Sequence, residues 1–106
     1  MLKSASDGQE AEAPAAAPEI LVWPYEFQLS RQVKAHGDDM ICLVLDAPSG
    51  KEVFEFNLLT GLTQDQVRPL ISRLAKVPAS TVDTMAAEDV IALAARLSRF
   101  FNRAAA

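Results

Sequence analysis

Few side chains in this sequence have the chemistry of a reactive site, and their spacing does not bring them together. His36 is the only histidine and Cys42 the only cysteine among 106 residues. His36 precedes Gly37 in an expected turn, whereas Cys42 lies between apolar residues of an expected strand. A structural zinc site needs about four nitrogen or sulfur ligands, and these two residues supply half of them. We therefore expect a turn histidine that faces solvent and a buried strand thiol.

The acidic residues and the glycines give no further candidate. Asp38, Asp39 and Asp46 lack the twelve-residue pattern of a calcium-binding loop. The four glycines are scattered, so none belongs to a glycine-rich phosphate loop. The sequence therefore predicts no catalytic residues, no metal site and no cofactor, and we expect that the protein is not an enzyme.

The charge distribution argues against nucleic acid as a partner. The net charge is -4, and residues 1–22 carry Lys3 as their one base against four acids, which are Asp7, Glu10, Glu12 and Glu19. The rest of the chain is close to neutral, whereas binding to a phosphate backbone depends on clustered positive charge. The sequence contains no run of 18 apolar residues, so it predicts no membrane-spanning helix. A single cysteine excludes an internal disulfide, and the first residues lack the apolar region of a signal peptide, so we expect a cytoplasmic protein.

The chain length allows one domain. Residues 1–19 are rich in alanine, proline and glutamate and are expected to form a disordered leader. Residues 20–103 are expected to form a single small α+β domain. Within it, Trp23 and Tyr25 flank Pro24; they either cover one end of the core or form an adhesive patch.

Alternating apolar residues predict a β-hairpin at the start of the domain. Residues 26–34 read as an edge strand whose apolar face is interrupted by Arg31. A loop of several residues is expected at 36–39, where Gly37 is free to adopt positive φ. Residues 40–45 then form a second strand that is apolar on both faces.

Helical patterns follow the hairpin. Residues 51–59 fit either a short helix or a third strand. Thr63 and Gln66 predict a capping box at the start of the next helix, and a single turn is expected across residues 80–83. The last helix starts near Ala86 or Ala87. The apolar stripes of the two longer helices are Val67, Leu70, Ile71, Leu74 and Val77, and then Val90, Ile91, Ala94, Leu97, Phe100 and Phe101. The predicted fold is a two-stranded hairpin packed against two or three C-terminal helices.

The last helix also carries the predicted partner-binding surface. Phe100 and Phe101 are consecutive and therefore point about 100° apart, which is more than a thin core readily accommodates. A basic ridge runs beside them. The predicted contact residues are Val90, Arg96, Leu97, Arg99, Phe100, Phe101 and Arg103. The alternative is that the arginines form a solvated face next to a wide core stripe.

The order of these elements resembles a known family. Its opening resembles Phe27-Gln28-Leu29-Ser30, the Gly37 turn, and the stretch from Leu43 through Asp46-Ala47-Pro48-Ser49-Gly50 to Val53. Its closing half resembles the stretch from Ile71 to Pro78, then Val82-Asp83-Thr84-Met85 and residues 87–93. On these residues the chain resembles the small tail assembly chaperones of Mu-like contractile-tailed phages and prophages. Asp46 and Ala47 depart from the Arg-Glu pair of that family.

The resemblance implies a function in virion assembly. Such proteins are thought to bind the long tape measure protein and to keep it soluble in the host bacterial cytoplasm, and they are absent from the mature particle. It also implies a frameshifted longer form of the same chain as a further partner. The sequence leaves open whether the chain forms a homo-oligomer. The alternatives are a structural tail component and a small regulatory or nucleic-acid-binding module.

Overall fold

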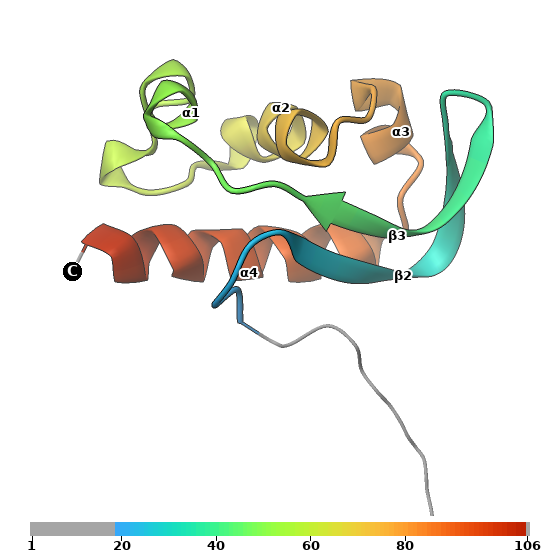
Figure 1. Cartoon of the computed structure of the whole chain (residues 1–106), viewed down its shortest axis with the longest axis horizontal. Helices are drawn as coiled ribbons and strands as arrows, with labels where there is room; N and C mark the ends of the chain where they lie inside the picture. The colour runs from blue at the N-terminus through green and yellow to red at the C-terminus, as the bar shows by residue number, and fades with distance from the viewer. Residues whose placement is uncertain (1–18, 106) are drawn as a thin grey trace, which may run out of the picture.

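The computed structural model describes residues 19–105. The predicted leader, residues 1–19, lies outside this part of the chain except for Glu19. The elements follow the order β2 (Tyr25–Ala35), β3 (Asp38–Leu45), α1 (Gly50–Glu55), the 3-10 turn η1 (Leu58–Thr60), α2 (Gln64–Ala75), α3 (Ala79–Asp83) and α4 (Ala87–Ala105). The predicted α+β fold, a two-stranded antiparallel hairpin followed by helices, is confirmed (Figure 1).

The hairpin turn is shorter than the sequence predicted. Only His36 and Gly37 connect the strands, and both have positive φ, at 54° and 84°. Two consecutive left-handed residues are typical of the tight turns that match the twist of paired strands. Asp38 and Asp39 belong to β3, where they pair with Ala35 and Lys34. The prediction of a longer loop at 36–39 was wrong. Aspartate is common in turns, but these two aspartates pair with β2 as strand residues.

A wide bulge interrupts the hairpin near its middle. Gln28 pairs with Cys42 and Val33 pairs with Met40, so residues 29–32 lie opposite Ile41 alone. Arg31, the residue that breaks the apolar face, lies in this bulge, and its Nη2 donates a hydrogen bond to the Thr84 carbonyl at 3.0 Å. The bulge thus turns part of β2 away from its partner strand and toward the chain that precedes α4.

The core lies between the inner face of the hairpin and the two longer helices. β2 and β3 alternate buried and exposed residues where they pair, as a sheet with one solvated face does. α2 packs against β3, and α4 packs against β2. The side chains enclosed completely are Ile20, Leu43, Leu45, Leu70, Ile71, Leu93 and Leu97. No helix within residues 19–105 has the length and apolar character needed to cross a membrane.

The local structure settles the alternatives between the hairpin and α4. Residues 51–59 are helical, with α1 followed by η1, rather than a third strand. Thr63 is the N-cap of α2 as expected, but the predicted capping box with Gln66 is absent; the Thr63 hydroxyl instead donates to Asp65 Oδ1 at 2.7 Å. The expected turn at 80–83 is α3.

The apolar stripe of α4 differs from the predicted one in two residues. Leu93 is buried, and together with Leu97 and Phe101 it forms a row at intervals of four residues. Ile91, which the sequence placed in the core stripe, is 68% exposed. Because Val90 already faces the core, its neighbour on the helix must point elsewhere.

Candidate functional site

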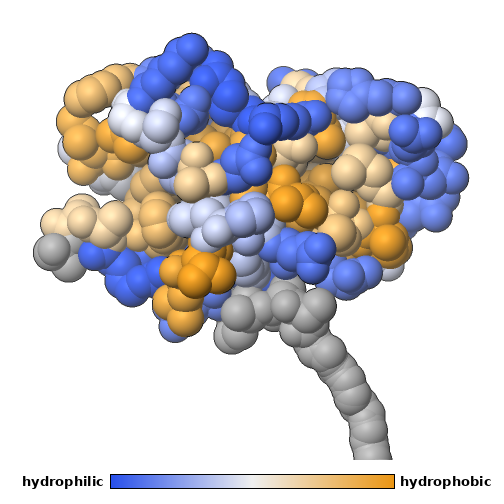
Figure 2. All heavy atoms as spheres, viewed as in Figure 1, coloured by the Kyte–Doolittle hydropathy of each residue, from blue (hydrophilic) through white to orange (hydrophobic). Residues whose placement is uncertain are grey.

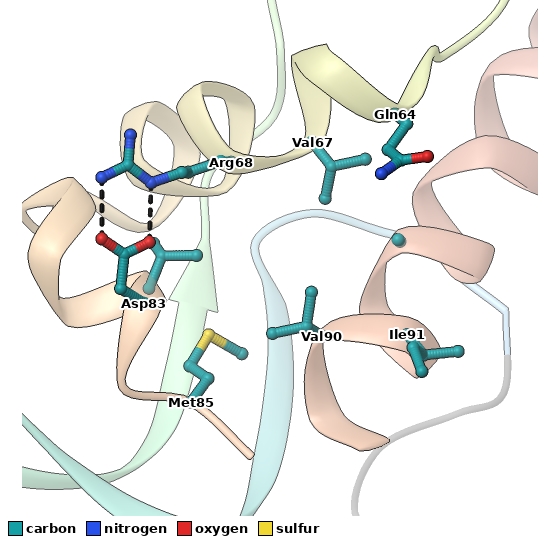
Figure 3. Close-up of a pocket in the computed structure, with 9 residues that line it drawn as sticks. Gln64, Val67, Arg68, Asp83, Met85, Val90 and Ile91 are labelled. Carbon is teal, nitrogen blue, oxygen red and sulfur yellow. Dashed lines mark hydrogen bonds and ion pairs between the residues drawn. The ribbon is translucent and has the colours of Figure 1, made fainter. Parts of the chain in front are cut away.

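An apolar groove lies where the first half of α2, the end of α3 and the first half of α4 meet. Its volume is about 440 Å³. Its lining residues are Gln64, Val67, Arg68, Val82, Asp83, Met85, Val90, Ile91 and Ala94. Figure 3 shows Val67 from α2 and Val90 from α4 pointing toward one another across it.

Helical spacing explains why these side chains meet. On α2, Val67 lies one turn before the buried Leu70 and Ile71, at the margin of the apolar face. On α4, Val90 and Ala94 flank the buried Leu93 in the same way. The groove is therefore the uncovered edge of the core between two amphipathic helices, and its floor has the composition of the core beneath it.

An ion pair forms the polar rim of the groove. Arg68 Nε and Nη2 donate to Asp83 Oδ1 and Oδ2, each at 2.7 Å, in a bidentate arrangement (Figure 3). The hydrogen bonds from Arg68 lower the pKa of Asp83, and the same hydrogen bonds raise the pKa of Arg68. Because the two charges pair with each other at the edge of the groove, neither charged side chain belongs to its apolar floor.

Ile91 stands on the opposite side with most of its side chain in solvent. An exposed aliphatic side chain on its own is common, but Ile91 adjoins the half-buried Val90 and Ala94 in one concave surface. A concave, mainly aliphatic surface of this size accepts side chains of another polypeptide, as in the recognition of an amphipathic helix by an apolar groove. The carboxylate that lines it, Asp83, is held in the ion pair with Arg68.

A second pocket of about 450 Å³ lies between the hairpin and α3. Its lining residues are Gln32, Val33, Lys34, Asp39, Ser80, Thr81 and Thr84. Lys34 pairs with Asp39 at 2.7 Å, and the Thr81 hydroxyl donates to the Lys34 carbonyl at 2.7 Å. These polar groups are already bonded to one another, and only Val33 adds a large aliphatic side chain, so the groove between α2 and α4 is the better candidate for binding an apolar segment.

The structure disperses the residues predicted to bind a partner. Leu97 is fully buried and Phe101 is 7% exposed, so neither contacts a partner while the fold is intact. That part of the prediction was wrong, because both side chains are buried in the core. Val90 alone among the predicted residues lines the groove between α2 and α4.

Residues near the start of the domain cover the rest of the predicted surface. Phe100 packs against Trp23 with ring centroids 5.1 Å apart, so Trp23 covers one end of the core as the first alternative predicted. Arg103 binds Glu19 and the Ile20 carbonyl.

Two arginines complete the account of the predicted surface. Arg96 donates to the Tyr25 hydroxyl at 2.8 Å, and its guanidinium lies 5.1 Å from the centre of the Phe27 ring. Arg96 therefore joins α4 to β2. Arg99 lies on the exposed side of α4.

Sequence reasoning missed the contributions of α2 and α3 to the groove. Its one usable signal was the adjacency of Val90 and Ile91, which cannot both face the same core. The same argument was applied to Phe100 and Phe101, where Trp23 supplies the cover that local sequence does not reveal. Outside the groove, exposed Phe54 and Leu59 lie on α1 and η1. Leu21 and Val22, which precede β2, are also exposed. Figure 2 shows apolar surface beside the point where the described chain begins.

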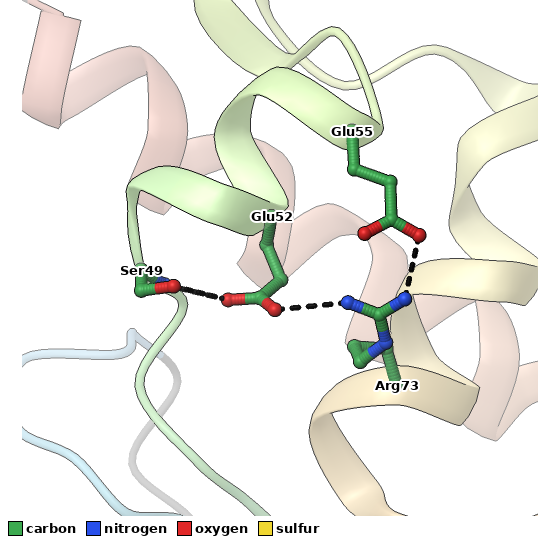
Figure 4. Close-up of polar contacts among 4 residues, drawn as sticks. All are labelled: Ser49, Glu52, Glu55 and Arg73. Carbon is green, nitrogen blue, oxygen red and sulfur yellow. Dashed lines mark hydrogen bonds and ion pairs between the residues drawn. The ribbon is translucent and has the colours of Figure 1, made fainter.

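A polar cluster fastens α1 to α2 (Figure 4). Glu52 Oε1 accepts hydrogen bonds from the Ser49 hydroxyl at 2.7 Å and the Ser49 amide at 2.9 Å. Its other oxygen accepts from Arg73 Nη1 at 2.9 Å, and Arg73 also binds Glu55. The hydrogen bonds from Ser49, followed by that from Arg73, lower the pKa of Glu52 to about 2. Every group here is bonded to another, so the cluster is structural.

The isolated reactive side chains stay apart from both pockets. His36 Nε2 lies 3.3 Å from the Lys76 carbonyl at the end of α2. Burial, and secondarily the charge of Glu26, raises the pKa of Cys42, which makes its thiolate scarcer. Within the described range 19–105, no three His, Cys, Asp or Glu residues are grouped as metal ligands.

Comparisons of this chain with protein-family models, with curated proteins and with solved structures gave no match.

Proposed function

We propose that this protein is a phage tail assembly chaperone that binds an apolar helical segment of the tape measure protein and keeps that protein soluble during tail assembly. The observation that carries the binding activity is the apolar groove between α2 and α4, which we call the client groove. Ile91 lies on one side of it and the Arg68–Asp83 ion pair on the other. The choice of the tape measure protein as client follows from the family resemblance described above.

The groove fits a helix that presents aliphatic residues on one face. Side chains at positions i, i+3 and i+4 of a helix lie together and fill a groove of this kind as anchors. Val67 provides an apolar contact from α2 and Ile91 provides one from α4, whereas Val82 and Met85 are buried and form the floor of the groove. Burial of these surfaces removes apolar area from water on both partners, at about 25 cal/mol per Å² before the costs of association.

A shallow groove suits a chaperone better than a permanent subunit. Its aliphatic lining offers few anchors, and its rim charges are already paired with one another. Such contacts exclude water from an aggregation-prone client but are weak enough to yield to tail tube subunits. We therefore place the protein in the host bacterial cytoplasm and outside the mature particle.

Co-expression with the tape measure protein encoded by a neighbouring gene tests this proposal. The chain is expected to increase the soluble fraction of the tape measure protein severalfold and to copurify with it. An equally insoluble tape measure protein with and without the chain would reject the proposal. Mass spectrometry of purified particles separates a chaperone, which should be missing, from a structural tail component, which should be present.

A further inference from the structure

The chain that precedes β2 covers the second half of α4. Residues 19–23, which we call the cover segment, run against the helix although more than 70 positions separate the two in sequence (Figure 1). Glu19 Oε1 accepts from Arg103 Nη1 at 2.8 Å, and Arg103 Nη2 donates to the Ile20 carbonyl at 2.6 Å. Trp23 then packs edge-on against Phe100.

The attachment of the cover segment differs from that of the rest of the fold. Residues 19–23 belong to no helix or strand, and an exposed ion pair, a part-buried hydrogen bond and the half-buried Trp23 ring accompany the one buried side chain that holds them. Ile20 is fully buried, whereas Leu21 and Val22 are each 73% exposed. The Ile20 side chain is therefore inserted as a plug, while Leu21 and Val22 remain in water. A segment attached in this way can be displaced by another segment.

We propose that the surface beneath the cover segment is a second protein-binding surface, and that its partner is a segment of another protein with the same order of side chains. That segment carries an acidic residue for Arg103, next an aliphatic residue for the site of Ile20, and three positions later an aromatic residue for Phe100. Charge complementarity at Arg103 and the shape of the plug site define this chemistry. The inference goes beyond the proposed function because it uses the opposite half of α4 from the client groove.

Competition between the cover segment and such a partner follows from their shared site. A segment of the same chain is present at an effective concentration in the millimolar range. An external segment therefore binds with an affinity reduced by the fraction of molecules whose cover is open. Weakening the cover without altering α4 raises that fraction and strengthens external binding by the same factor.

A peptide of residues 19–24, labelled with fluorescein, provides a probe whose chemistry is known. Its binding to the full-length protein is measured by fluorescence anisotropy. Glu19→Lys removes the ion pair from the cover but keeps Arg103 for the peptide, so the variant should bind the peptide about fivefold more tightly than the wild type does. Trp23→Ala, which removes the contact with Phe100, should act in the same direction.

The double variant Glu19→Lys with Arg103→Glu is the matched control. Within the chain it restores an ion pair, with the two charges exchanged. It also places a carboxylate at position 103, where it repels the glutamate of the peptide. The gain in peptide affinity should therefore vanish. Hydrogen exchange provides a second readout: amides of residues 96–103 should exchange faster in Glu19→Lys, while those of β2 and β3 stay unchanged.

Three results would overturn the inference. The first is equal peptide binding by the wild type and both single variants, and the second is a double variant that binds as tightly as Glu19→Lys. The third is a wild-type dimer formed by exchange of cover segments, which would make the partner a second copy of this chain.

Discussion

Asp89 Oδ2 accepts two hydrogen bonds from Ser30, one from its amide at 2.9 Å and one from its hydroxyl at 3.1 Å. Asp89 lies in the first turn of α4 and is 5% exposed, whereas Ser30 lies in the bulge of β2. The carboxylate therefore satisfies a backbone donor that the bulge removes from strand pairing, and it also lies favourably at the positive end of the α4 dipole. This contact fixes where α4 begins relative to the hairpin, and so it positions the groove residues of the next turn.

We expect Asp89→Ala to lower the free energy of unfolding by about 2–3 kcal/mol, because it breaks two hydrogen bonds to a charged group and leaves the Ser30 amide without this acceptor. Urea denaturation measures the loss. Glu88→Ala is the control, because Glu88 is the exposed neighbour in the same helical turn and should change stability by no more than about 0.5 kcal/mol. Equal effects of the two substitutions would contradict the role given to Asp89.

The Glu52 cluster predicts an acid-dependent loss of stability. The pKa of Glu52 is about 2 in the folded chain, against an ordinary value of 4.5. The carboxylate therefore stabilises the fold fully above about pH 4.5, and this contribution disappears as the pH falls toward 2. The stability difference between the wild type and Glu52→Gln should shrink over that interval. Titration of the Glu52 side-chain carbon by NMR with a midpoint near 4.5 would refute the cause assigned here.

The turn between the strands allows a matched comparison of two glycines. Gly37 has a φ of +84°, whereas Gly50 begins α1 with open space around the position of an added Cβ. Gly37→Ala should destabilise the protein by about 1 kcal/mol or more, and Gly50→Ala should be neutral or slightly stabilising. Thermal unfolding of the two variants measures the difference. Equal midpoints would contradict the left-handed turn.

Phe101 and Ile91 separate a core position from a surface position on the same helix. Phe101→Ala should reduce the free energy of unfolding by about 3–5 kcal/mol, since it opens a cavity in the core. Ile91→Ala should alter it by about 0.5 kcal/mol or less. Chemical denaturation measures both free energies of unfolding. A small loss for Phe101→Ala would contradict a core position and would support the sequence-based assignment of Phe101 to the binding surface.

The sequence predicted the elements well because their signals are local. Alternation located β2, a short stretch that is apolar on both faces located β3, and the spacing of Leu70, Ile71 and Leu74 located α2. Asp38 and Asp39 misled the prediction of the turn, since only pairing with Lys34 and Ala35 reveals that they belong to a strand.

The candidate site was less predictable because it depends on contacts distant in sequence. The stripe of α4 shows that some apolar residues face outward but not which of them another segment covers. Trp23 covers Phe100 from the far end of the domain, whereas Ile91 stays exposed. The groove itself needs α2, α3 and α4 together, so no single stretch of sequence encodes it.

The most direct test of the client groove compares two equally exposed aliphatic residues. Ile91 and Leu59 are 68% and 69% exposed, but only Ile91 lines the groove. Each is replaced by glutamate, and the affinity for the copurified tape measure protein is measured by titration, with unfolding midpoints as the control for folding. We expect Ile91→Glu to weaken binding at least tenfold and Leu59→Glu to leave it within about twofold of the wild type. The reverse order, or equal losses, would contradict the assignment of the client groove.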